Sequence, residues 1–144
     1  MSTQTAHPPR KRWLWIVAGA LIVLVANIAV HVLYMVVYSY LINPGHDQPF
    51  YNEHAMKSGP YSSIIAGIPL MFLVCRWVCR KFDANSSVST AVLIWLVYFL
   101  IDLTAVAAAG ELVRAAIIFL ASFATKFAAA YLAGLVVRRE KSKA

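Results

Sequence analysis

Long runs of apolar residues, separated by short polar segments, fill almost the whole chain. The runs cover residues 13–42, 60–79, 88–107 and 112–137. A helix needs roughly 20 apolar residues to cross the hydrocarbon core of a bilayer, and backbone facing lipid must satisfy its own hydrogen bonds. The pattern therefore predicts an all-α integral membrane four-helix bundle, with residues 1–144 as a single membrane domain and no soluble domain.

Turn-forming residues separate the apolar runs. Asn43-Pro44-Gly45 is expected to end the first helix, because proline disfavours helix in the residue before it and glycine permits the turn. Ser58-Gly59-Pro60 is expected to open the second helix, with the proline in its first turn. These signals leave residues 43–59 as an outer loop, and long loops are often functional.

Composition and charge give the predicted orientation. Charged residues make up only 13% of the chain, against about 25% in soluble domains. The net charge of +7 comes from Lys and Arg beside the apolar runs, so no nucleic-acid partner is expected. Lys and Arg collect on the cytoplasmic side of membrane helices. Both termini are therefore predicted inside (N-in/C-in), with Arg10, Lys11, Arg12, Arg76, Arg80, Lys81, Arg138, Arg139, Lys141 and Lys143. The outer side holds only Lys57 and Arg114.

A stripe of polar residues follows one face of the first predicted helix. Asn27, His31, Tyr34 and Tyr38 are spaced so that all four share that face, which should point inward. At a rise of about 1.5 Å per residue, His31 lies roughly 24 Å from the inner interface and Asp102 roughly 21 Å. Asn27, His31 and Asp102 are therefore predicted to form one polar cluster in the outer third of the bundle.

Several roles for this cluster stay open. A His31–Asp102 contact would favour a charged imidazolium, whereas Arg114 is a competing partner for Asp102. The cluster could fix helix register, or it could be a ligand, proton or ion site open to the outer side. Outer-loop residues that would lie above it are His46, Asp47, Glu53 and His54. No metal site is predicted, because His31 and Met35 have no second histidine motif to support them.

The fourth predicted helix carries one lysine among small residues. Lys126 lies near its middle and is expected either to extend to the inner interface or to line a central cavity. Small residues let helices approach closely in lipid; one ridge is Ala121, Thr125, Ala129 and Ala133, and the next is Ser122, Lys126, Ala130 and Gly134. These ridges favour assembly into a homo-oligomer or a larger membrane complex.

Three classes of function fit these features, and the chain carries no catalytic or cofactor motif that names a reaction. The preferred function is an accessory or oligomeric membrane component whose surroundings are the lipid bilayer, in a bacterial inner membrane. The alternative is a small transporter or ion- or proton-conducting protein that uses the polar cluster around His31 and Asp102. A membrane-embedded enzyme with these two residues as an acid–base pair is a second alternative. Cys75 and Cys79 are interpreted as packing residues without a redox or metal role.

Overall fold

A computed structural model describes residues 9–108, 110 and 116–143 of the chain. All regular structure in these residues is helical, as the apolar runs predict. The elements in chain order are α1 (Pro9–Val37), the π-helical segment η1 (Tyr38–Ile42), α2 (Gln48–Cys79), α3 (Ala84–Ala108) and α4 (Ala116–Lys143). Each of the four long helices has the length and apolar composition needed to cross a membrane.

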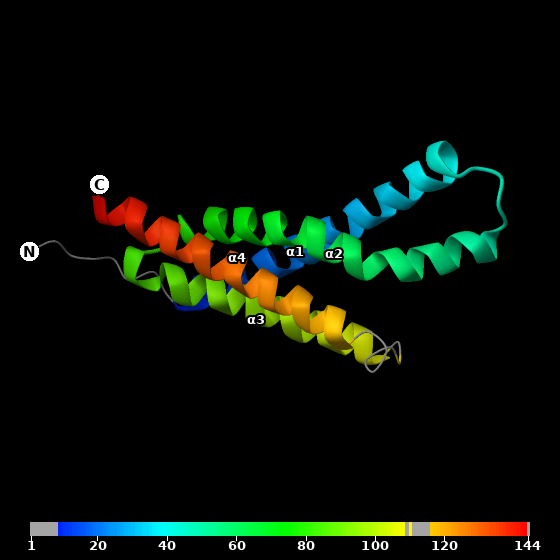
Figure 1. Ribbon diagram of the computed structural model, residues 1–144. Helices are drawn as coiled ribbons and strands as arrows, with labels where there is room; N and C mark the ends of the chain where they lie inside the picture. The colour runs from blue at the N-terminus through cyan, green and yellow to red at the C-terminus, as the bar shows by residue number, and fades with distance from the viewer. Residues whose placement is uncertain (1–8, 109, 111–115, 144) are drawn as a thin grey trace, which may run out of the picture.

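The helices form two antiparallel hairpins, α1 with α2 and α3 with α4 (Figure 1). The start of α1, the end of α4 and the turn between α2 and α3 lie at one end of the bundle, here named the terminal end. The opposite end, where α1 meets α2 and where α3 ends, is named the connection end. Both α1 and α4 pack against α2 and α3. Toward the connection end the two hairpins diverge (Figure 1).

The predicted loop 43–59 is mostly helical, which corrects the expected start of the second helix. The structure begins α2 at Gln48, where the Asp47 side chain accepts a hydrogen bond from the Phe50 backbone N–H at 3.3 Å. Pro49 occupies the first turn of α2. An aspartate N-cap followed by proline is itself a helix start signal, and it precedes Pro60 in the chain. Pro60 therefore lies inside α2 and removes one of its backbone hydrogen bonds.

The other helices extend beyond their apolar runs. The first begins at Pro9 instead of residue 13, the third covers Ala84–Ala108 instead of 88–107, and α4 continues to Lys143 instead of ending at 137. Hydropathy marks only the apolar part of a helix, whereas Arg, Glu and Lys at its ends are good helix formers. Residues 112–115, where the fourth helix was expected to begin, lie outside the described residues.

The contact between α3 and α4 depends on Gly134. A Cβ added at Gly134 would lie 2.8 Å from the Val88 Cα and 3.2 Å from the Ala91 Cβ. Ala130, one turn earlier on α4, is fully buried. Small residues allow helix backbones to approach closely. The predicted ridge that ends at Gly134 is therefore used inside this chain, where it packs α4 against α3.

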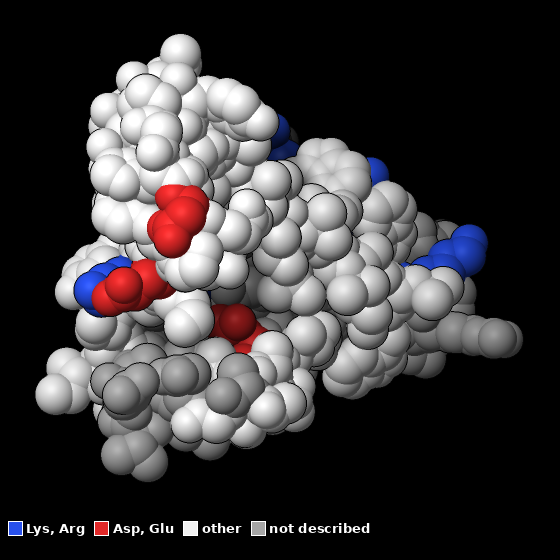
Figure 2. Space-filling model, turned by 90° about the vertical axis from the view of Figure 1, so that its right-hand side faces the viewer, with Lys and Arg blue, Asp and Glu red and all other residues white. Residues whose placement is uncertain are grey.

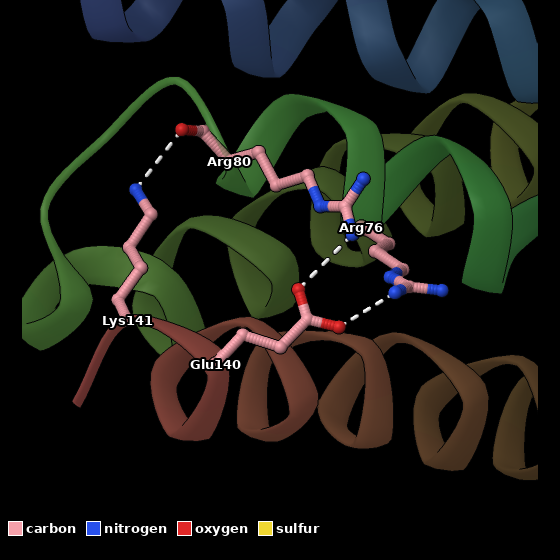
Figure 3. A network of polar contacts seen from close by, with 4 residues as sticks. All are labelled: Arg76, Arg80, Glu140 and Lys141. Atoms are coloured by element: carbon pink, nitrogen blue, oxygen red, sulfur yellow. Dashed lines mark hydrogen bonds and ion pairs between the residues drawn. The ribbon is translucent and has the colours of Figure 1, made fainter. Parts of the chain in front are cut away.

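A polar cluster joins α2 to α4 at the terminal end (Figure 3). Glu140 accepts hydrogen bonds from Arg76 at 2.5 Å and from Arg80 at 3.1 Å. Lys141 donates to the backbone carbonyl of Arg80 at 2.9 Å and to that of Phe82. Basic side chains commonly bind the free carbonyls at the C-terminal end of a helix. These contacts hold the two hairpins together at the terminal end.

Candidate functional site

A buried lysine lies at the centre of the bundle. Lys126, near the middle of α4, has 0% of its surface exposed. Its Nζ donates hydrogen bonds to the Ser63 hydroxyl on α2 and to the Tyr98 hydroxyl on α3, both at 2.8 Å. Burying an ammonium group is strongly unfavourable unless it is hydrogen-bonded. The two hydroxyls are therefore what allows Lys126 to occupy this position.

The hydrogen bonds continue from Lys126 to the other helices. Asn27 on α1 donates through Nδ2 to Ser63 Oγ at 2.9 Å, and the Tyr98 hydroxyl donates to Asp102 Oδ2 at 3.3 Å. The series Asn27, Ser63, Lys126, Tyr98 and Asp102, here named the Lys126 network, joins all four helices. Hydrogen bonds connected in series polarise one another in a low-dielectric interior. The network is therefore a continuous polar path through an otherwise apolar bundle.

Gly67 on α2 provides the space that Lys126 occupies. A Cβ added at Gly67 would overlap the Lys126 Cε and lie 3.1 Å from Nζ. Gly67 is itself buried. Any side chain at this position would force the end of the Lys126 side chain to shift relative to Ser63 and Tyr98.

The Lys126 network is open toward one end of the bundle and closed toward the other. Asp102 is only half-buried. Figure 2 shows a hollow between the helices at the connection end, with acidic side chains at its rim and inside it. On the terminal side, Met71, Cys75 and Ile94 are fully buried and apolar. Among the described residues, the network is therefore exposed toward the connection end, through Asp102.

The polar stripe of the first predicted helix, which was expected to point inward, contacts α2. His31 Nδ1 lies 2.8 Å from Ser62 Oγ, and the Tyr34 hydroxyl lies 3.0 Å from His54 Nε2. The Tyr38 ring stacks on the His54 ring with centroids 3.7 Å apart. Polar and aromatic contacts thus hold α1 and α2 together between the Lys126 network and the connection end.

The Lys126 network contains Asn27, Asp102 and Lys126 of the predicted residues but not His31. His31 and Asp102 form neither a hydrogen bond nor an ion pair with each other, since His31 contacts Ser62 and Asp102 contacts Tyr98. The two residues were predicted at similar depth in the membrane, but they lie on different hairpins, and the hairpins diverge toward the connection end. Arg114, the competing partner of Asp102, lies outside the described residues.

The expectation that Lys126 extends to the inner interface is wrong. The side chain stays inside the bundle because two neutral hydroxyls and the space above Gly67 accommodate it. The alternative, in which the lysine lines a central cavity, stays a prediction.

The four predicted outer-loop residues have local partners. The His46 ring lies 3.1 Å from Asn43 and stacks on Phe50, and Asp47 caps α2. Glu53 on α2 pairs with Lys57 at 2.6 Å, and His54 contacts Tyr34. None of the described contacts links these four side chains to the Lys126 network.

The two cysteines are buried packing residues, as predicted. Cys75 and Cys79 are both free thiols, and Cys79 Sγ lies 3.1 Å from the Ser87 carbonyl oxygen across the α2–α3 contact. Within residues 9–108, 110 and 116–143, no group of three His, Cys, Asp or Glu side chains could hold a metal ion.

Sequence reasoning did not assign Ser63, Gly67 or Tyr98 to the predicted site. The signal available was their spacing: Tyr98 and Asp102 are four residues apart on one helix, and so are Ser63 and Gly67. Residues four apart share a helix face. A buried charge needs such hydroxyl and small-residue neighbours, but the sequence does not say which helices face one another.

Comparisons of the chain with models of protein families, with curated proteins and with solved structures find no match.

Proposed function

We propose that this chain is a small multi-pass membrane protein that takes up a small ion from the outer side through the Lys126 network. It would be a transporter or an ion-conducting protein. The observation that supports this proposal is a fully buried lysine hydrogen-bonded within a path that crosses all four helices. Ionisable side chains inside membrane helices are costly and are typical of ion and proton pathways.

A purely structural role explains the network less well. Replacing buried charged groups by apolar groups of similar volume is often neutral or stabilising, so a lysine is a poor way to hold helices together. The network also has an open side at the connection end, through half-buried Asp102. Access from one side is what a binding step requires.

The proposed orientation puts the terminal end in the cytoplasm of a bacterium, with the protein in the inner membrane. The described basic residues at the terminal end include Arg76, Arg80 and Lys141. The excess of Lys and Arg on cytoplasmic flanks supports this direction. The open side of the Lys126 network would then face outward.

Reporter fusions test this orientation. A reporter fused after Ala144 is expected to be active in the cytoplasm, and one inserted beside Asn52, an exposed residue of α2, is expected to be active outside. The reason is the strong bias of Lys and Arg toward the terminal end. An external C-terminus would contradict the N-in/C-in orientation.

Flux measurements in liposomes test the proposed uptake. We expect the reconstituted protein to dissipate an imposed gradient of protons, K⁺ or Cl⁻ faster than empty liposomes. Lys126→Met should lower the rate at least about tenfold, because it removes the central ionisable group of the proposed path and a tenfold change in rate corresponds to a barrier change of only about 1.4 kcal/mol.

Thr125→Val is the matched control for the flux measurement. Thr125 is the neighbouring residue, is exposed, and its hydroxyl donates only to the Ala121 and Ser122 carbonyls of its own helix. This variant should conduct like the wild type. Wild-type flux no faster than that of empty liposomes would contradict the transport proposal.

An accessory or oligomeric membrane component is the second candidate, and failure of the flux measurement would favour it. The α1–α2 hairpin supports it, because large apolar side chains on its connection half are exposed, among them Leu33 and Ile65. Lipid or a second protein must cover this surface. The enzyme alternative has less support, since His31 and Asp102 do not contact each other.

A further inference from the structure

We propose that the Lys126 network is a proton-binding site in which Asp102 and Lys126 share a proton through the Tyr98 hydroxyl. The inference deepens the proposed function, on which it rests, by naming the proton as the ion that the network takes up. Asp102 is the group nearest to the open side, and Lys126 is the deepest charged group of the network.

The Tyr98 hydroxyl has the two contacts that a relay requires. It accepts a hydrogen bond from Lys126 Nζ at 2.8 Å and donates one to Asp102 Oδ2 at 3.3 Å. Tyr98 is fully buried, so bulk water does not compete for either contact. A hydroxyl with a donor on one side and an acceptor on the other can receive one proton while it releases another.

The transfer leaves the tyrosine unchanged. The Lys126 ammonium gives one proton to the Tyr98 oxygen, and the original hydroxyl proton of Tyr98 passes to Asp102 Oδ2. One N–H bond and one O–H bond break while two O–H bonds form. The ion pair becomes a neutral amine and a neutral carboxylic acid, and Asp102 can then exchange its proton with water at the connection end.

Apart from Tyr98, no described ionisable side chain contacts this pair. On α1, the network includes Asn27, which is uncharged. His31, also on α1, is hydrogen-bonded to Ser62 and not to the network. On α2, the network includes Ser63, and Gly67 leaves room for the Lys126 side chain. Two charged residues between α3 and α4 in the chain, Glu111 and Arg114, lie outside the described residues.

Two polar groups of the network have no hydrogen-bond partner among the described residues. Asn27 Oδ1 is buried with no hydrogen-bond partner in the described part of the chain, and Asn27 is only 9% exposed. An ammonium carries three donors, and Lys126 uses two of them on Ser63 and Tyr98.

Nuclear magnetic resonance of the full chain in lipid nanodiscs tests this inference. The protein is labelled with ¹⁵N at lysine and with ¹³C at aspartate, and the Lys126 signal is identified by its loss in Lys126→Met. We expect the Lys126 Nζ and Asp102 carboxyl signals to change together in the same pH steps, because strongly interacting groups titrate as a pair. Asp102→Asn should move the Lys126 steps by at least about one pH unit.

Tyr98→Phe isolates the relay, since it keeps both charged groups and removes only the hydroxyl. The two signals should then change at separate pH values, and Asp102→Glu should retain the joint titration. Glu140→Gln, at the terminal end, should change nothing. Lys126 steps that are the same in Asp102→Asn or Tyr98→Phe as in the wild type would overturn the inference. Joint titration without ion flux would contradict only the proposed transport, and flux with separate titrations would contradict only the shared proton.

Discussion

Gly134→Val is expected to lower the free energy of unfolding by about 1–3 kcal/mol, the usual range for overpacking a tight contact. The added side chain would meet the Val88 Cα at 2.8 Å and the Ser87 carbonyl oxygen at 3.2 Å. These are backbone atoms, so no rotamer change can move them away and α4 must separate from α3. Thermal unfolding of the purified protein in detergent measures the loss.

Ala128→Val is the control for this prediction. Ala128 lies on the same helix and is exposed, so the larger side chain meets no other helix. Only the lower helix propensity of valine remains, which corresponds to less than about 1 kcal/mol. Equal stability of the Gly134 and Ala128 variants would show that α3 and α4 are farther apart than the structure has them.

Gly67→Ala is expected to destabilise the protein by about 2 kcal/mol, through Lys126 and not through the helix. The new Cβ would overlap the Lys126 Cε, and displacing Nζ breaks its hydrogen bonds to Ser63 and Tyr98. Hydrogen bonds to a charged group contribute about 1.5–3 kcal/mol. Alanine in a helix is otherwise about 1 kcal/mol more favourable than glycine.

A double-mutant cycle separates these two effects. In a Lys126→Ala background the lysine Cε is gone, so Gly67→Ala should be neutral or stabilising by up to about 1 kcal/mol. The sign of the change at Gly67 therefore depends on Lys126. If Gly67→Ala has the same effect in both backgrounds, the two residues are not in contact.

The four helices were predictable because each depends on a local property of the chain. An apolar run of sufficient length predicts a membrane-spanning helix wherever the other helices lie. The start of α2 was a local feature too, since Asp47 and Pro49 form a cap and a first turn. It was missed because Ser58-Gly59-Pro60 is a similar signal nearer to the apolar run, and hydropathy does not distinguish a polar helix from a loop.

Part of the candidate site could also be predicted from the sequence alone. The spacing of Asn27 and His31 predicted a face of α1 that points inward, and both side chains contact α2. Lys126 and Asp102 stood out as charges within apolar runs. Helix periodicity gives the shared face and the depth of such residues.

By itself, the sequence determined the helical class, the number of long helices and the residues whose burial requires an explanation. Only the tertiary structure decided which side chains these buried residues contact. Lys126 meets Ser63 and Tyr98, and Asp102 meets Tyr98 and not His31. The physical reason is that partners on different helices depend on which helices pack side by side and how closely. That depends on small residues such as Gly67 and Gly134, whose effect appears only when two helices meet.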